Sequence, residues 1–246
     1  MILDNGQAIS PLFSIPWVTK DICRIDWLHC ADQGVTADYL GNLFIMTANK
    51  LPGANFKSRV ETLWLKIQKF YEDYKVDDRL HMLLPTMLKQ SKKAPKLRGS
   101  AAQVRALVPC ALKLSQEILS RGTPVEEAAI VGMVHLDQCY KALSKDSIFH
   151  ADILREHSRQ FALQYTVLEA AFEDPKSWRI KPKLHLFLEL AAEGSKPALF
   201  WTYRDEDFGG SVSKLARRRG GLLSVKAFSC NLLQLFMMHQ PMLRMV

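Results

Sequence analysis

Hydrophobic residues repeated at helical spacing constrain the fold of this chain more than any other feature of its sequence. In the stretch that begins at Asn55, apolar residues recur at alternating steps of four and three, which places them on one side of an α-helix. We expect three more helices in a row, beginning near Ser100, Thr123 and Ile148, and therefore a mainly α protein with a bundle-like centre. The residues of the first stripe are Phe56, Val60, Leu63, Ile67, Phe70 and Tyr74.

Boundary signals indicate where several helices begin. Thr123-Pro124-Val125-Glu126 offers an N-cap, a proline at the first helical position and a glutamate that can close a capping box. Thr36 is expected to cap a helix over residues 37–49, and Pro85 to interrupt a short helix over residues 80–88. Shorter helices are expected over residues 184–192, 211–219 and 224–239, with an aromatic and acidic loop over residues 200–210.

One short segment predicts a strand instead. The run from Ile22 to Trp27 is rich in β-branched and aromatic residues, which favour the extended backbone of a sheet. The residues before it contain two prolines among the first twenty and show no sustained period, so we expect an extended arm there. The sequence thus leaves room for at most a strand or two beside the helices.

The composition excludes several classes of protein. With 246 residues, 48% of them apolar and 24% charged, the chain is not disordered or of low complexity and can bury a core. Its five cysteines are odd in number and widely spread, which argues against a disulfide framework. No leading signal-peptide pattern and no apolar run near the roughly 18 residues of a membrane span occur. We expect a nuclear or cytoplasmic protein, neither secreted nor membrane-embedded.

Positive charge is concentrated in two places. The chain has 33 Lys and Arg against 25 Asp and Glu, a formal net charge of +8, and such an excess favours polyanionic partners when it is clustered. One cluster lies between residues 89 and 113, where no acidic residue occurs, and the other between residues 214 and 219. Either they bind the nucleic-acid backbone, or they are a solvated loop and a helix end. The DNA-binding candidates are Lys89, Lys92, Lys93, Lys96, Arg98, Arg217, Arg218 and Arg219.

Two carboxylate and histidine pairs are candidates for metal-dependent chemistry. Asp26, at the end of the expected strand, precedes His29 by three residues, and His185 precedes Glu189 by four on an expected helix. Carboxylate oxygens are the ligands that Mg²⁺ prefers, and paired ions can stabilise the oxygens that exchange at a phosphodiester. The alternatives are that Asp26 caps a helix beside a buried histidine and that Glu189 faces solvent. A third acidic group, residues 205–207, suits a hard cation or ion pairs with the arginines at 217–219.

Two islands of sequence resemble one family. Ile25-Asp26-Trp27-Leu28-His29, then Gly34-Val35 and Leu40-Gly41-Asn42-Leu43, resemble the D-x-x-H, G-V and L-G-N segment of CACTA-type cut-and-paste DNA transposases and related transposon-borne reading frames. Lys181-Pro182-Lys183-Leu184-His185, which leads to Glu189, is similar to the K-x-H segment that those proteins carry after a helical insertion. The order of the islands and their rough separation agree with that family.

The resemblance implies an RNase H-like core that holds divalent metal with three acidic residues and is interrupted by a helical insertion domain. Asp26 would be the second acid, His29 the histidine of its motif and Glu189 the third acid. The first acid should lie on an earlier strand, yet only Asp4 and Asp21 precede Asp26. The resemblance therefore implies that the chain is the C-terminal part of such an enzyme. Such a part would be inactive alone and would hold Mg²⁺ only if its set of acidic residues were complete.

These observations give two functional expectations. The first is a transposase-derived DNA-binding protein without strand-transfer activity of its own, in which residues 1–50 form the arm and core remnant, 51–175 the helical insertion and 176–246 the returning helices. The second is a helical protein–protein interaction module that binds no nucleic acid and docks a partner chain through the stripe between Asn55 and Tyr74. Target sequence and oligomeric state are not encoded in any motif.

Overall fold

The computed structural model describes residues 3–4, 7–8, 15–16, 18–19, 24–88, 93–119, 122–144, 148–174, 176–218, 224, 226–227, 229–231 and 233–234. The chain divides into two compact units, Met1–Trp201 and Thr202–Val246. It is mainly helical, which confirms the predicted fold class. The expected boundaries near residues 50 and 175 both fall inside the first unit.

The first unit carries most of the helices. Two short strands, β1 (Leu3–Asp4) and β2 (Gln7–Ala8), pair antiparallel near the start of the chain. A π-helix, η3, then runs directly into α1, and a short 3-10 helix, η4 (Pro197–Leu199), follows the last α-helix of the unit. The other elements are η3 (Leu28–Thr36), α1 (Ala37–Asn49), α2 (Phe56–Asp73), α3 (Pro85–Leu88), α4 (Ala101–Ile118), α5 (Pro124–Ala142), α6 (Ala151–Ala171) and α7 (Pro182–Ala192).

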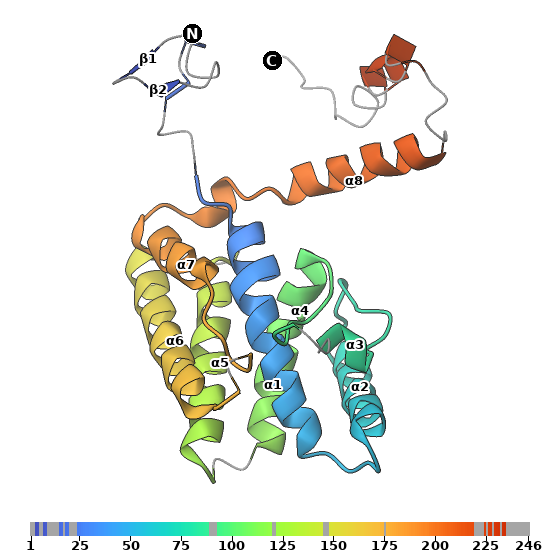
Figure 1. The fold of residues 1–246 in the computed structure, drawn as a ribbon, viewed down its shortest axis with the longest axis vertical. Coiled ribbons are helices and arrows are strands. Elements are labelled where there is room, and N and C mark those ends of the chain that lie inside the picture. Colours follow the sequence, from blue (N-terminus) through green and yellow to red (C-terminus); the bar gives the residue numbers. More distant parts are fainter. Residues whose placement is uncertain are drawn as a thin grey trace. The chain divides into compact units, whose positions relative to one another are not determined.

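Helix α1 is the centre of this unit (Figure 1). It packs against α2, α3 and α4. Helix α4 in turn packs against α5, α5 against α6, and α6 against α7. Helix α7 closes the arrangement because it packs back against η3, the segment that precedes α1. The segments η3 and α7 therefore lie side by side, although some 150 residues separate them in sequence.

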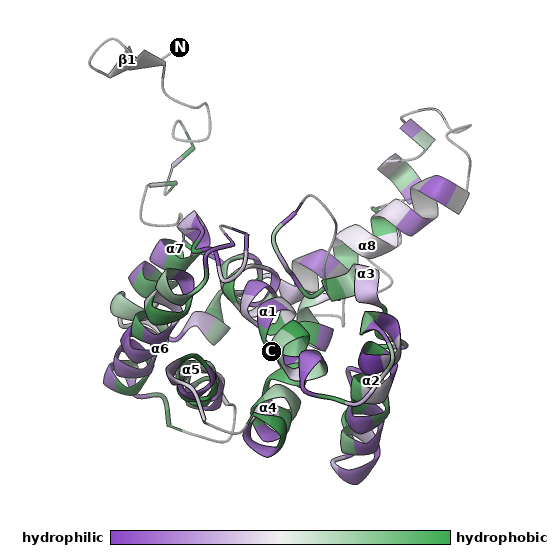
Figure 2. Cartoon of the chain, turned by 60° about the horizontal axis from the view of Figure 1, so that its bottom comes forward, coloured by the Kyte–Doolittle hydropathy of each residue, from purple (hydrophilic) through white to green (hydrophobic). Residues whose placement is uncertain are grey.

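The stripe predicted on α2 is buried rather than exposed. Val60, Leu63 and Ile67 are fully buried in the common core, and Phe70 is nearly so. Figure 2 shows the two-sided character of such helices, with hydrophilic and hydrophobic residues on opposite sides. Helix α1 thus covers most of the stripe, although Tyr74 at its end is exposed, and the docking of a partner chain to this helix stays a prediction.

The helix starts predicted at Asn55 and Thr123 are confirmed by their caps. The Asn55 side chain accepts a hydrogen bond from Ser58 N, and the Ser58 side chain accepts one from Asn55 N, a reciprocal capping box. Thr123 likewise accepts a hydrogen bond from Glu126 N at the start of α5. The Glu126 carboxylate forms an ion pair with Lys50 Nζ at 2.5 Å, so this side chain connects α5 to the end of α1.

The strand expected over Ile22–Trp27 is wrong in its described part. Residues 24–26 have no regular structure, and Trp27 begins the helical run that continues through η3 and α1 without a cap at Thr36. Trp27 is fully buried, with its ring 5.6 Å from that of Tyr140 and 5.5 Å from that of Phe187. Packing between helices thus outweighed the extended-backbone preference of this short run.

The described part of the second unit contains α8 (Tyr203–Arg218). A helix therefore replaces the loop expected over residues 200–210. The side chains of Asp205 and Asp207 and the residue Arg219 lie outside the described residues, so their ion pairing stays a prediction. The last helix expected, over residues 224–239, also lies largely outside them.

Candidate anion-binding site

Asp26 and His29 form a local helix cap. Asp26 Oδ2 accepts a hydrogen bond from His29 N at 3.0 Å and lies 2.6 Å from His29 Nδ1, while Asp26 O accepts one from Cys30 N. This is the geometry of an N-cap whose acceptor also orients the neighbouring imidazole. The His29 side chain is 52% exposed, not buried as the capping alternative assumed.

His185 and Glu189 share the outer face of α7. Their side chains are 74% and 59% exposed, and His185 Nε2 lies 3.9 Å from Glu189 Oε1. Leu184 and Phe187, on the opposite face, are buried. The alternative in which Glu189 faces solvent therefore describes its position, and an exposed pair of this kind contributes little to stability.

The structure does bring the two resembling islands together. Lys183 Nζ, at the start of α7, donates a hydrogen bond to His29 O at 2.6 Å, and Cys30 Sγ donates one to Lys183 O. At the other end of α7, Glu193 forms an ion pair with Arg24. The segment around Asp26 and helix α7 are thus neighbours.

The proximity of the two islands does not by itself place metal ligands together. Within the described residues, no three His, Cys, Asp or Glu side chains come together in a group able to hold a metal ion. One oxygen of Asp26 is already used by the His29 backbone and ring, and Glu189 lies at the surface beside His185. The described donors do not fit the three-acid site that the resemblance implies, so no step through Mg²⁺ is derived, and Mg²⁺ binding stays a prediction.

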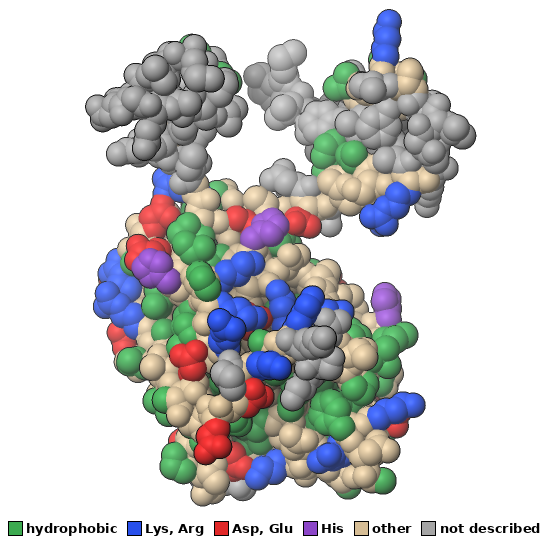
Figure 3. Space-filling view, viewed as in Figure 1, with side chains coloured by type: hydrophobic (Ala, Val, Ile, Leu, Met, Phe, Trp, Pro, Cys, Tyr) green, Lys and Arg blue, Asp and Glu red, His purple; other side chains and the backbone are tan. Residues whose placement is uncertain are grey.

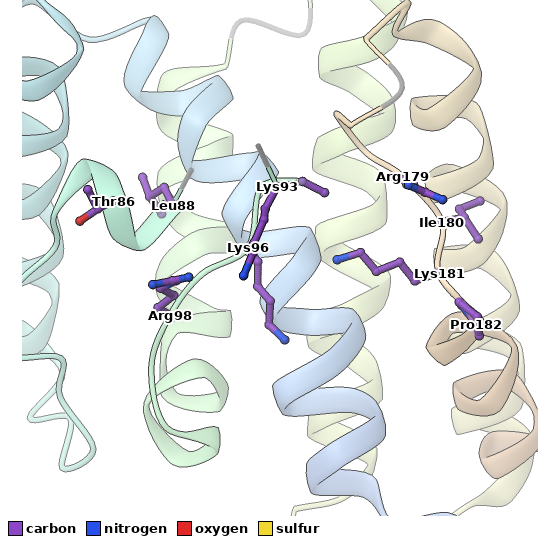
Figure 4. A pocket seen from close by; sticks show the side chains of 10 residues that line it. Thr86, Leu88, Lys93, Lys96, Arg98, Arg179, Ile180, Lys181 and Pro182 are labelled. Atoms are coloured by element: carbon purple, nitrogen blue, oxygen red, sulfur yellow. The ribbon is translucent and has the colours of Figure 1, made fainter. Parts of the chain in front are cut away.

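A basic pocket of about 560 Å³ lies where the islands meet residues 93–98, the cationic linker that precedes α4. Lys and Arg side chains gather near the centre of the face seen in Figure 3. Figure 4 shows that they come from two segments, one leading to α4 and the other leading into α7, on either side of α1. The lining residues are Thr86, Leu88, Lys93, Ala94, Lys96, Arg98, Arg179, Ile180, Lys181 and Pro182.

The basic side chains of the pocket form a half-buried floor and an exposed rim. Lys96 and Lys181 are half-buried, whereas Lys93, Arg98 and Arg179 are exposed. Among the described residues, only one of these five side chains forms an ion pair with a carboxylate: Lys181 Nζ lies 2.7 Å from Oδ1 of the nearly buried Asp38. The pocket therefore has a surplus of positive charge in a concave, partly desolvated site.

The pKa values of Lys96 and Asp38, at the floor of the pocket, are shifted mainly by burial. Burial lowers the pKa of Lys96 below its ordinary value; the nearby Lys183 and Lys181 lower it further, and Asp38 opposes them. Burial raises the pKa of Asp38, against the opposing effect of its hydrogen bond from Lys181. Burial is the main cause of both shifts, so they indicate that the floor of the pocket is partly desolvated.

Two glycines of the first island allow the basic segments to approach η3 and α1. A Cβ at Gly34 would lie 2.6 Å from Lys183 Cδ, so the side chain that reaches His29 O would have to move. A Cβ at Gly41 would lie 2.5 Å from the Cα of Lys96 and 2.7 Å from Leu97 N. The close contact at Gly41 brings Leu97 N within 2.8 Å of Ala37 O, to which it donates a hydrogen bond.

Asn42, in the same island, fixes the other wall. Its Oδ1 accepts a hydrogen bond from Trp178 N at 2.9 Å, and its Nδ2 donates one to Asp38 O. Trp178 has a φ of +55°, a left-handed conformation that costs a non-glycine residue roughly 1–2 kcal/mol. Its buried ring packs 4.9 Å from that of Tyr39, which holds this conformation and positions the residues that follow, including Arg179.

The structure thus divides the predicted DNA-binding residues. Lys93, Lys96 and Arg98 line one pocket, and Lys96 Nζ donates a hydrogen bond to Gln33 O. Arg217 is exposed on α8, in the second unit, to which Arg218 also belongs. Lys89, Lys92, Arg219 and the side chain of Arg218 lie outside the description.

Sequence reasoning missed the opposite wall as a binding surface. Arg179 carried no signal, and Lys181 and Lys183 were noted only as part of a motif leading to Glu189. No local pattern connects them to Lys93, Lys96 and Arg98, because the two segments meet only through the packing of distant helices.

Comparison with protein-family models, curated proteins and solved structures gives no match to this chain. Among the described residues, no helix has both the length and the apolar character needed to cross a membrane. The feature of the molecule that points to a function is therefore the chemistry of the pocket itself.

Proposed function

We propose that this chain is a nucleic-acid-binding protein, derived from a transposase of the kind its two islands resemble, that contacts phosphate groups of DNA at the basic pocket. The observation that carries the proposal is that five Lys and Arg side chains, from two distant segments, line one pocket in which only Lys181 is paired with a carboxylate among the described residues. Phosphate oxygens are the natural partners of such clusters, since phosphates supply most of the charge that cationic proteins neutralise on DNA.

The residues that carry the resemblance support this proposal in a specific way. Gly34, Gly41 and Asn42 in the first island and Lys181 and Lys183 in the second all serve to bring the cationic segments together or to anchor them. The shared pattern is therefore used here to shape a cationic surface. Strand transfer by this chain alone is not part of the proposal.

A salt series separates phosphate binding from non-specific charge. The affinity of a fluorescent duplex is measured by anisotropy between low and physiological salt, for the intact chain and for the triple variant Lys93→Gln, Arg98→Gln, Arg179→Gln. All three are exposed residues of the pocket rim. Because each phosphate contact contributes about 0.9 to the slope of log affinity against log salt, the variant should lose roughly 2 to 3 of that slope.

The matched control removes the same charge elsewhere. Lys66 and Lys69 on α2 and Arg159 on α6 are exposed, and none lines the pocket. Their triple replacement by Gln should leave the slope nearly unchanged. Equal losses in the two triple variants would mean that net charge rather than the pocket binds DNA, and no binding at low salt would end the proposal.

A further inference from the structure

The shape of the basic pocket restricts the kind of phosphate that it can hold. A volume of about 560 Å³ lies within the range of roughly 300–1,000 Å³ typical of pockets for small ligands and cofactors. Proteins that follow a continuous backbone use cations spread along a groove or stripe. Here the cations stand on both walls of one hollow (Figure 4), an arrangement suited to a single phosphate group.

The charge of the pocket matches a terminal phosphate better than an internal one. A phosphodiester carries one negative charge, whereas a phosphate monoester carries about 1.5 to 2 at neutral pH. Lys96 and Lys181 provide the floor, and the exposed Arg98 and Arg179 can each present a planar fork of donors to phosphate oxygens. Helix α7 begins at Pro182, also in the lining, and the positive end of its dipole adds to the same field.

The lining also offers surface for the rest of a nucleotide. Ala94, Ile180 and Pro182 provide apolar surface beside the charged groups, whereas Leu88 is buried in the core beneath them. A site that only neutralised a passing backbone would have no use for apolar walls, whereas a terminal nucleoside can pack against them. The pocket therefore combines the two surfaces that a phosphorylated strand end presents.

From this geometry, and resting on the proposed function, we infer that the pocket binds a phosphate monoester at the end of a nucleic-acid strand together with its adjoining nucleotide. The structure assigns the floor and rim cations to the phosphate and the apolar lining to the sugar or base. The end in question is the 5′ or the 3′ end, since both present the same chemical group.

The test compares oligonucleotides that differ only at their ends. Anisotropy competition with the intact chain measures the affinity of one single-stranded DNA with a 5′-phosphate, with a 3′-phosphate and with hydroxyl groups at both ends, together with a free mononucleotide. We expect at least a tenfold preference for one phosphorylated end over the hydroxyl form. In Arg179→Gln and in Arg98→Gln, checked for folding by circular dichroism and thermal unfolding, that preference should fall below threefold, whereas Lys66→Gln should retain it.

Each result decides a different claim. Equal affinity for phosphorylated and hydroxyl ends, with salt-dependent binding of both, overturns this inference and leaves the proposed function standing. A preference that persists in both Arg variants also overturns it, because the phosphate would then bind elsewhere. Binding of the mononucleotide as tight as that of the phosphorylated strand overturns the assignment to a strand end. No binding of any oligonucleotide at low salt refutes both claims.

Discussion

Replacing Gly41 with alanine tests how the pocket is built. The added Cβ would lie 2.5 Å from Lys96 Cα and 2.6 Å from Lys96 N, and backbone atoms cannot rotate away as a side chain can. The linker must therefore move off α1, which weakens the hydrogen bond from Leu97 N to Ala37 O and displaces the Lys96 side chain from the pocket floor.

The magnitude follows from three opposing contributions. Overpacking costs about 1–3 kcal/mol and loss of one hydrogen bond about 1 kcal/mol, while alanine gains about 1 kcal/mol over glycine inside a helix. The net loss in free energy of unfolding is about 2 kcal/mol, which lowers Tm by roughly 4–8 °C for a unit of this size. DNA affinity should fall in parallel, because half of the pocket is displaced.

Thermal unfolding and duplex anisotropy check this prediction together. The control is Gly209→Ala in α8, where a Cβ would meet no atom within 4 Å. That variant should be as stable as the original chain or slightly more so. A Gly41→Ala protein with unchanged Tm and unchanged affinity would refute the reasoning that this glycine exists for the close approach of the linker.

Three further predictions concern buried groups. Tyr140→Phe removes the hydroxyl that donates to the buried Asp32 and should lower the free energy of unfolding by about 1–3 kcal/mol in urea titrations; no loss would contradict this. Burial raises the pKa of Asp38 in the folded state above its ordinary value of 3.8, so the folded state binds this proton more tightly than the unfolded state does. The contribution of Asp38 to the free energy of unfolding therefore falls as pH rises from the unfolded-state pKa to the folded-state pKa. The stability difference between the intact chain and Asp38→Asn should therefore shift in favour of the intact chain as pH is lowered through that interval, and a pH-independent difference would contradict the shift. At about pH 8, iodoacetamide should modify the exposed Cys230 in the folded protein, whereas three buried cysteines with raised pKa should react only after unfolding, as read by peptide mass spectrometry. These three are Cys30, Cys110 and Cys139.

The helices could be predicted because their signals are local. The stripe from Val60 to Phe70, the helix starts at Asn55 and Ser100 and the cap at Thr123 depend on residues within one or two turns, and all appear as expected. The prediction of a strand before His29 was wrong because its residues are equally suited to a buried helix. The choice between strand and helix depends on the packing of Trp27 against the distant Tyr140 and Phe187.

The site was half predictable for a similar reason. A run of lysines is visible in the sequence, so Lys93, Lys96 and Arg98 could be identified as candidates. Arg179 and Lys181, on the opposite wall of the pocket, could not be identified in this way. They come close to the lysine run only through the packing of α7 on η3 and the turn at Trp178. The spacing of Asp26 and His29, by contrast, left a metal site and a helix cap as alternatives, and the structure shows the cap.

Lysine footprinting measures whether DNA occupies the basic pocket. The protein is treated with an amine-reactive ester with and without saturating duplex DNA, and modification at each lysine is read by mass spectrometry. The account predicts that DNA protects Lys93, Lys96 and Lys181 at the pocket and leaves Lys66 and Lys69 on α2 as reactive as before. Protection of the α2 lysines with no change at the pocket would contradict it.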